Sequence, residues 1–517
     1  MINVLEYLEQ TLTSIDNHDK PAFIGEDETL TFAKLSNAAR AIGSFLYSRE
    51  IHRSPVAVFM GKSPAMIGAF LGVVYGGNYY VPLDAEMPAF RIKLILETLN
   101  PPLLICDDVT AELARQWELS YPIVTYTEAK THPIDENALA GIRRCSIDTD
   151  PLYVVFTSGS TGIPKGVVAC HRSVIDYIEN FSQVLGVTSD TVFGNQSPLY
   201  LDACLKEIYP TLKFGASTYL IPRGLFMFPV KLIEYINERG INTICWVASA
   251  LGLVAGLGAL AKNIPYTLHT VAFGSEVFPI KHFNRWHEVL PNAKFIHLYG
   301  PTEATGMSTY YVVDRAFGEN ESIPIGRPFP NTEIVLLDVN DNAPKKGEAG
   351  EICIRGTGLS LGYFGDITRT QNVFMQNPLS AFPDIIYKTG DLGRYGENGE
   401  LYFISRKDHQ IKHMGHRIEL AEIEWLATRF DGIEMVCAVF DDTPSHIVLY
   451  YLARQGIEKR HVMEYLKANL PRYMMPHAIF ELAEIPLTPG GKCDRVGLLA
   501  KYREERQAKK AAAPPRS

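Results

Sequence analysis

The chain has 517 residues, of which 46% are hydrophobic and 21% are charged, and its formal net charge is −9. This composition excludes a disordered chain and disfavours a general nucleic-acid binder, which would carry a basic excess. At roughly 100–200 residues per domain, the length predicts about three domain-sized units. The eight cysteines never form a Cys-x-x-Cys pair, so neither a zinc site nor a disulfide framework is indicated. The N-terminus lacks the basic and apolar regions of a signal peptide, so we expect a cytoplasmic protein with no membrane partner.

Two uncharged stretches, residues 63–83 and 243–261, approach the length of a membrane span. A glycine pair and Pro82 interrupt the first, which we interpret as a buried helix, a turn and a strand. The second opens with a strand-like run and continues in small residues, as expected for a buried strand followed by a buried helix.

Short apolar runs alternate with helix-like segments over most of the chain. The expected strands include residues 56–59, 103–106, 153–156, 218–221, 270–273 and 295–298, and the expected helices include residues 65–75, 228–239 and 280–290. Such alternation predicts an α/β fold of parallel sheets covered by helices. From about residue 330, strands separated by turns predict a small β-barrel-like unit, with strands near residues 333–337, 350–355 and 399–404.

A domain boundary is expected near residue 406. It divides an N-terminal core, residues 1–406 with a β-rich subdomain at about 330–406, from a small α+β domain at residues 407–517. The elements expected in the second domain are helices at 420–429 and 457–470 and strands at 435–440, 446–452 and 478–482. The charged, then Ala/Pro-rich tail at 501–517 is expected to be a frayed end.

The most informative segment is TSGSTGIPKG at residues 157–166, which directly follows an apolar strand-like run. Its glycines let backbone N–H groups approach a ligand closely, its hydroxyl groups add donors, and its lysine adds a cation. This set suits nucleotide phosphates, although the glycine–lysine spacing is not that of Walker A. The predicted phosphate-binding residues are Thr157, Ser158, Gly159, Ser160, Thr161, Gly162 and Lys165.

The same segment resembles the signature of the adenylate-forming superfamily, which includes acyl-CoA synthetases and the adenylation domains of nonribosomal peptide synthetases. Further motifs of that superfamily follow in order: YGPTE at 299–303, GEAGEICIRG at 347–356, LGYF at 361–364, YKTGD at 387–391, RKDHQIK at 406–412, GHRIE at 415–419 and PGGK at 489–492. The layout resembles stand-alone amino-acid-activating enzymes, especially D-alanine–carrier-protein ligases.

The resemblance implies that a carboxylate and ATP form an acyl-adenylate and pyrophosphate, after which a thioester forms on a phosphopantetheine thiol. Because two anions must meet, this chemistry needs cations and oriented donors. The resemblance assigns Lys492 as the cation that bridges carboxylate and α-phosphate, Glu303 as the Mg²⁺ ligand, and Thr302 as a phosphate donor.

The remaining nucleotide contacts implied by the resemblance come from Tyr299 and Gly300 beside the adenine, Asp391 on the ribose, and Arg406 on the ribose or phosphates. Asp408 lies where the superfamily has its hinge, so the C-terminal domain is expected to be mobile. After adenylation, the loop at residues 413–416 would face the carrier's thiol.

Asp202 aligns with the residue that binds the substrate's ammonium group in amino-acid-activating members, although local sequence also allows an N-cap of the following helix. The pocket implied by the alignment is lined by Asp202, Ala203, Lys206, Cys245, Ala272, Gly274, Leu298, Gly306 and Met307. Lys206 could pair with an acidic or polar substrate side chain, pair with Glu207, or point outward.

Gly274 stands where D-alanine enzymes typically carry cysteine, which weakens the D-alanine assignment. We therefore expect an amino-acid-adenylating ligase that uses ATP and Mg²⁺ and loads a separate holo carrier protein. The alternatives are a D-alanine–carrier-protein ligase, an acyl-CoA synthetase-type ligase and a non-catalytic protein that kept the fold. The sequence leaves open the amino acid, its chirality, the carrier, the pathway and the oligomeric state.

Overall fold

The computed structural model describes residues 1–159, 162–454, 457–486 and 493–512. Its chain divides into two compact units. The first comprises Met1–Ala85, Leu96–Phe156 and Gly166–Asp408, and the second comprises Glu86–Ile95, Thr157–Lys165 and His409–Ser517. Two internal segments, one of them in the phosphate loop, thus group with the C-terminal residues, although both precede the predicted boundary at residue 406.

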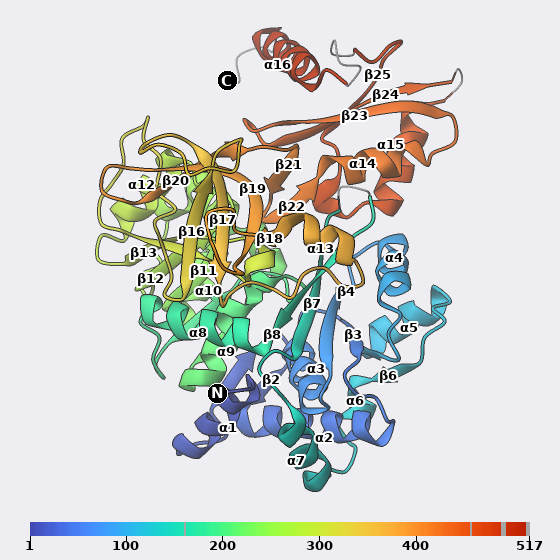
Figure 1. Ribbon diagram of the computed structural model, residues 1–517, viewed down its shortest axis with the longest axis vertical. Helices are drawn as coiled ribbons and strands as arrows, with labels where there is room; N and C mark the ends of the chain where they lie inside the picture. Colours follow the sequence, from blue (N-terminus) through green and yellow to red (C-terminus); the bar gives the residue numbers. More distant parts are fainter. Residues whose placement is uncertain (160–161, 455–456, 487–492, 513–517) are drawn as a thin grey trace. The chain divides into compact units, whose positions relative to one another are not determined.

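A nine-stranded sheet occupies the middle of the first unit. Its strands, in spatial order, are β15 (Arg327–Pro328), β14 (Thr309–Val313), β13 (Lys294–Tyr299), β12 (Thr270–Gly274), β11 (Thr243–Val247), β9 (Val192–Asn195), β10 (Ser217–Leu220), β1 (Pro21–Ile24) and β2 (Thr29–Thr31). The neighbours from β13 to β1 pair in parallel, and only the pairs at the two edges are antiparallel. The helices of this part of the chain are α8 (His171–Leu185), α9 (Leu205–Phe214), α10 (Pro229–Glu238), α11 (Ala248–Gly256) and α12 (Ile280–Val289), and α8 and α9 lie side by side (Figure 1).

A second, six-stranded sheet contains β6 (Ile123–Thr125), β5 (Leu104–Cys106), β3 (Pro55–Met60), β4 (Tyr79–Asp84), β7 (Pro151–Thr157) and β8 (Lys165–Cys170). The helices in residues 1–145 are α1 (Leu5–Ser14), α2 (Phe32–Ser48), α3 (Pro64–Tyr75), α4 (Ala89–Leu99), α5 (Asp108–Gln116), α6 (Tyr126–Ala129) and α7 (Glu136–Cys145). One buried apolar cluster includes Val56 and Val58 of this sheet, Phe193 of the first sheet, and side chains of α2, α3, α8 and α9. The α/β class predicted from the alternating pattern is therefore confirmed.

The two uncharged stretches form short elements. Ser63 caps α3 and Pro64 occupies its first turn, so the helix begins where the sequence has its start signals. It ends before the glycine pair, and β4 follows. The second stretch forms β11 and α11. Among the described residues, no helix is long and apolar enough to cross a membrane.

The predicted β-rich part is a five-stranded antiparallel sheet in the first unit. It contains β16 (Thr332–Leu337), β17 (Gly350–Gly356), β18 (Phe374–Gln376), β19 (Ile385–Tyr395) and β20 (Leu401–Arg406), with the short helix α13 (Ile367–Val373). Its apolar face includes Ile334, Ile352 and Leu401, which pack against Tyr299 at the end of β13. This packing sets the end of β13 beside β19, which carries Asp391.

The C-terminal part of the second unit is α+β. It contains β21 (Gln410–His413), β22 (His416–Glu419), α14 (Leu420–Thr428), β23 (Ile433–Asp441), β24 (His446–Ala453), α15 (Lys459–Asn469), β25 (Ala478–Glu481) and α16 (Arg495–Ala512). Ile423, Leu449 and Val462 belong to the apolar core between α14, α15 and the three-stranded sheet of β23, β24 and β25.

The expectation of a frayed tail is wrong for residues 501–512, which belong to α16. Tyr502 of this helix packs in an apolar cluster with Cys437 and Tyr450. The fully buried Asp441 accepts hydrogen bonds from Arg503 Nε at 2.8 Å and from Arg506 Nη1 at 2.9 Å. These contacts hold residues 501–512 in place, although their many charged side chains had suggested a solvated end. Residues 513–517 lie outside the described part of the chain.

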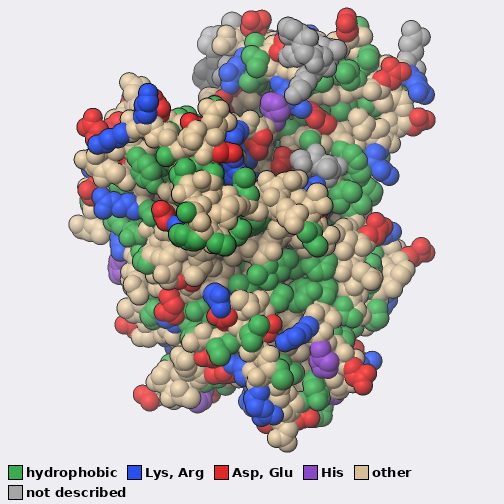
Figure 2. Space-filling view, in the orientation of Figure 1, with side chains coloured by type: hydrophobic (Ala, Val, Ile, Leu, Met, Phe, Trp, Pro, Cys, Tyr) green, Lys and Arg blue, Asp and Glu red, His purple; other side chains and the backbone are tan. Residues whose placement is uncertain are grey.

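Basic and acidic side chains are interspersed on the face drawn in Figure 2, with hydrophobic side chains exposed between them. Apolar atoms make up much of any protein surface, so scattered exposed hydrophobic side chains need no separate explanation.

Candidate active site

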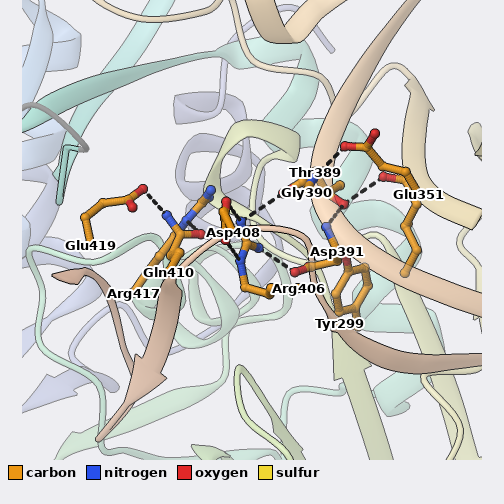
Figure 3. A network of polar contacts seen from close by, with 11 residues as sticks. Tyr299, Glu351, Thr389, Gly390, Asp391, Arg406, Asp408, Gln410, Arg417 and Glu419 are labelled. Atoms are coloured by element: carbon orange, nitrogen blue, oxygen red, sulfur yellow. Dashed lines mark hydrogen bonds and ion pairs between the residues drawn. The ribbon is translucent and has the colours of Figure 1, made fainter. Parts of the chain in front are cut away.

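A buried carboxylate, Asp391 of β19, lies at the centre of a polar network in the first unit (Figure 3). The Tyr299 hydroxyl, at the end of β13, donates to its Oδ2 at 2.7 Å. The Arg406 guanidinium donates to its Oδ1. Burial, together with the charge of Asp391, raises the pKa of the Tyr299 phenol, so this group stays protonated as a donor. Residues of two other motifs, Tyr299 of YGPTE and Arg406 of RKDHQIK, therefore hold the carboxylate of the YKTGD motif in place.

Arg406 also forms a two-pronged ion pair with Asp408, the predicted hinge residue. Its Nε lies 2.7 Å from Oδ1 and its Nη2 lies 2.7 Å from Oδ2. Asp408 is the last residue of the first unit before the chain enters the second. Gly390 has a φ of +75°, and a Cβ there would lie 2.9 Å from Arg406 Nη2, so this position requires glycine.

Glu351 supports the same network from β17. Its Oε1 accepts from Gly390 N at 3.0 Å, and its Oε2 accepts from Lys407 Nζ at 3.0 Å. Glu351 lies within the GEAGEICIRG motif, and no role was predicted for it. In the second unit, Gln410 of β21 bonds with Arg417 and Glu419 of β22, so the strands that follow the hinge are also joined by side chains (Figure 3).

Glu303, the predicted metal ligand, lies in a short 3₁₀ turn, Thr302–Ala304, directly after β13. The residue is fully buried, and its Oε1 accepts a hydrogen bond of 2.7 Å from the Tyr363 hydroxyl. The turn is tight because a Cβ at Gly300 would lie 2.5 Å from the Gly306 carbonyl oxygen. The motif's glycine is thus required by backbone packing, and the predicted adenine contact at Gly300 stays a prediction.

Thr302, predicted to contact phosphate, lies near the Asp202 carboxylate within the first unit, and its hydroxyl lowers the pKa of that group. The predicted substrate pocket and the YGPTE motif therefore adjoin at this point. Desolvation has the largest influence and raises the pKa of Asp202 to about 6, while the charge of Lys206 lowers it. A carboxylate held largely out of water has a physical reason to bind a cation.

Asp202 does not cap α9. It begins the 3₁₀ turn Asp202–Cys204, and the N-cap residue of α9 is Cys204, with no side-chain cap. The capping role that local sequence allowed for Asp202 is therefore wrong.

Lys206 does not point outward. It is 2% exposed, and no hydrogen bond or ion pair joins it to the part of the chain that the structure describes. Its charge lowers the pKa of Asp202 and of Glu207, so the ammonium group lies near both carboxyl groups. Glu207 bonds instead with Asn195 Nδ2 at 3.3 Å, and burial raises its pKa to about 7.

The other predicted pocket residues lie on three adjacent parallel strands and the turn after them. Cys245 of β11 is opposite Ala272 of β12, and Gly274 is opposite Leu298 of β13. The remaining predicted residues are Ala203, which is buried in the 3₁₀ turn after Asp202, and Gly306 and Met307, which follow Glu303.

The backbone around Gly274 leaves no room for a side chain at this position. A Cβ there would lie 2.3 Å from the Leu298 carbonyl oxygen. A cysteine at this position would require a backbone shift. The departure from the D-alanine pattern therefore has a structural basis.

The described residues of the phosphate-loop segment contact α14 and its preceding strand within the second unit. Ser158 Oγ donates to the Arg417 carbonyl oxygen at 2.7 Å, and Gly159 N donates to Glu422 Oε2 at 3.3 Å. Thr157 Oγ1 is buried with no hydrogen-bond partner among the described residues, which leaves a donor for a ligand. Lys165 begins β8.

Gly162 has a φ of +83°, and a Cβ there would lie 2.4 Å from the Trp425 ring. Ser160, Thr161 and Lys492 lie outside the described residues, so their predicted roles stay predictions.

The chain matches the family described as "AMP-binding enzyme" over residues 14–364, and it belongs to that family, which is the adenylate-forming superfamily of the motifs above. It is 29% identical to surfactin synthase subunit 1 of Bacillus subtilis over 96% of this chain, but it spans 14% of that protein. It is also 29% identical to D-alanine–D-alanyl carrier protein ligase of Bacillus licheniformis, over 92% of this chain and 95% of the relative.

Two solved structures share the fold. An artificially fused adenylation–PCP di-domain from Klebsiella oxytoca aligns with a TM-score of 0.80 at 21% identity, covering 93% of this chain and 94% of that one. The o-succinylbenzoate CoA synthetase of Bacillus subtilis aligns with a TM-score of 0.82 at 20% identity, covering 96% and 98%. At these identities the likeness concerns the fold.

Proposed function

We propose that this protein activates an amino acid as an aminoacyl-adenylate at the expense of ATP, releasing pyrophosphate. It then transfers the aminoacyl group to the phosphopantetheine thiol of a separate carrier protein. The observation that carries the proposal is the Asp202 carboxylate, whose pKa desolvation raises and the nearby Thr302 hydroxyl lowers. A carboxylate in such surroundings is suited to an ammonium group, and the residue after Thr302, Glu303, is a buried carboxylate suited to a cation.

In this mechanism Asp202 binds the substrate's ammonium group and orients its carboxylate. Asp391, already held by Tyr299 and Arg406, accepts hydrogen bonds from the ribose, since each carboxylate oxygen has two lone pairs. Thr157 offers an unused hydroxyl donor to phosphate. The carboxylate oxygen attacks the α-phosphorus, and pyrophosphate leaves.

Glu303 would hold Mg²⁺, because a buried carboxylate oxygen is a hard ligand of the type that this cation prefers. When bound, the cation would neutralise charge on the phosphate oxygens. Lys492 would supply a second positive charge between the two reacting anions.

The substrate class is proposed from Asp202 and Lys206. The fatty or aryl acid substrate of an acyl-CoA synthetase would bring no ammonium group to Asp202, so we favour an amino acid. The buried ammonium of Lys206 supports a substrate whose side chain carries an acidic or polar oxygen. The carrier partner is supported by a relative that is named as a carrier protein ligase and that this chain covers almost fully. Gly274 argues against D-alanine as the substrate.

An ATP–pyrophosphate exchange screen over D-, L- and β-amino acids tests the proposal, with glutamate and aspartate included. We expect exchange with at least one amino acid, and loss of about 10²–10³-fold or more in Lys492→Ala, as for removal of a transition-state charge partner. Lys501→Ala, an exposed residue of α16, is the matched control. Undiminished exchange in Lys492→Ala would show that Lys492 is not the catalytic cation. Thioester formation on a holo carrier, compared with CoA, separates the two ligase classes.

A further inference from the structure

Tyr363 donates a hydrogen bond to the predicted metal ligand, Glu303. Its hydroxyl lies 2.7 Å from Glu303 Oε1, and the two residues are 6% and 0% exposed. A hydrogen bond to a carboxylate in such surroundings is stronger than one between neutral groups in water. The carboxylate is therefore held in one orientation by a residue 60 positions away in the sequence.

The backbone around Tyr363 is itself fixed. Residues 361–364 bond with β8, the strand that follows the phosphate-loop segment in the chain. The backbone contacts are Leu361 N to Val168 O at 2.7 Å, Val168 N to Gly362 O at 3.0 Å, and Phe364 N to Gly166 O at 2.8 Å. The hydroxyl is thus presented to Glu303 from a rigid element.

Two neighbours restrict Tyr363 further. Thr370 Oγ1 accepts from Tyr363 N at 2.9 Å, and the Phe374 ring lies edge-on to the Tyr363 ring at 6.3 Å. Gly362 has a φ of +104°, and a Cβ there would lie 2.4 Å from Thr370 Cγ2. The local sequence is therefore built to keep the tyrosine in place.

We propose that Tyr363 is a positioning residue that orients the Glu303 carboxylate for cation binding. The inference rests on the proposed function, in which Glu303 binds Mg²⁺. A carboxylate has about four lone-pair sites on its two oxygens, and the Tyr363 hydroxyl takes one of them. Partners of this kind orient metal ligands, and their loss typically costs about 10–100-fold in metal affinity.

Tyr363→Phe tests the inference, because it removes only the hydroxyl. We expect the Mg²⁺ concentration for half-maximal exchange to rise by about 10–100-fold, and the rate at saturating Mg²⁺ to recover toward that of the unaltered protein. Independently of activity, Mn²⁺ binding in the presence of a non-hydrolysable ATP analogue, followed by electron paramagnetic resonance of free Mn²⁺, should weaken by a similar factor. Tyr395→Phe is the matched control, since its hydroxyl bonds with the Ile334 carbonyl oxygen at 3.3 Å.

Thr370→Val provides a second variant that keeps the tyrosine and loosens its backbone, and it should shift Mn²⁺ binding in the same direction by a smaller factor. Unchanged Mn²⁺ binding in folded Tyr363→Phe, or in Thr370→Val if Tyr363→Phe does not fold, would overturn the inference. Glu303→Gln distinguishes a failure of the role inferred for Tyr363 from a failure of the metal-binding role proposed for Glu303. If it abolishes Mn²⁺ binding while Tyr363→Phe does not change it, only the role of Tyr363 fails. If Glu303→Gln has no effect either, Glu303 is not the metal ligand.

Discussion

The Tyr299 hydroxyl donates a 2.7 Å hydrogen bond to Asp391 Oδ2, and this bond links the end of a parallel strand to the antiparallel sheet. Because Arg406 donates to the other oxygen, the carboxylate is held on both sides. A predicted ribose-binding acid is therefore already oriented by two residues of the predicted nucleotide site.

Tyr299→Phe should raise the KM for ATP while leaving the fold intact. A hydrogen bond to a charged group contributes about 1.5–3 kcal/mol, which corresponds to roughly a 10- to 100-fold loss of affinity. Steady-state exchange kinetics at varied ATP measure this change. An unaltered KM for ATP would mean that Asp391 does not contact the nucleotide. Tyr395→Phe controls for the loss of a hydrogen-bonded, half-buried tyrosine hydroxyl.

Amino-acid binding should weaken as the pH falls through about 6, because the raised pKa of Asp202 brings its protonation into that range. Only the ionised carboxylate attracts an ammonium group, so the KM for the amino acid should rise on the acid side. Thr302→Val removes the hydroxyl that lowers this pKa, and the inflection should move to higher pH. A profile whose inflection is identical in Thr302→Val would remove Asp202 as its cause.

Ionisation of Asp202 should lower the stability of the folded protein, whereas it strengthens amino-acid binding. The folded pKa of about 6 exceeds the ordinary 3.8, so the folded protein binds the proton more tightly than the unfolded chain. The contribution of Asp202 to the free energy of unfolding is therefore largest below pH 4 and falls as the pH rises to about 6. Asp202→Asn should flatten this part of the stability profile, measured by denaturant unfolding at each pH.

Lys206→Met should change substrate choice. Lys206 is buried near the carboxyl groups of Asp202 and Glu207, so the variant should also lose some stability, because the fully buried Glu207 carboxyl loses a nearby positive charge. If the substrate carries an acidic side chain, exchange with that substrate should fall at least tenfold relative to uncharged amino acids. Lys231→Met, on the exposed side of α10, is the control. Equal loss with all amino acids would contradict a role for Lys206 in selection.

Local sequence predicted the elements whose apolar runs are long, such as β7 and β11, and it predicted the motif residues because they resemble a family. It could not predict α16 beyond residue 501, because the contacts that hold it come from Asp441 and Tyr450 elsewhere in the chain. The Tyr363–Glu303 hydrogen bond and the proximity of Thr302 to Asp202 involve residues far apart in sequence, and no local pattern marks such pairs. The burial of Lys206 likewise depends on tertiary packing.

Gly274→Cys tests whether the pocket residue typical of D-alanine enzymes can be introduced. The new Cβ would lie 2.3 Å from the Leu298 carbonyl oxygen. This oxygen belongs to the backbone of β13, so it cannot move aside as the end of a flexible side chain could. Overpacking of this kind typically costs about 1–3 kcal/mol, so the midpoint of denaturant unfolding should fall. Gly224→Cys is the matched control, because a Cβ at Gly224 meets nothing within 4 Å. We expect Gly274→Cys to be destabilised relative to that control and to gain no exchange with D-alanine. A stable variant that activates D-alanine would instead show that β12 and β13 can separate, and that this glycine does not set the substrate.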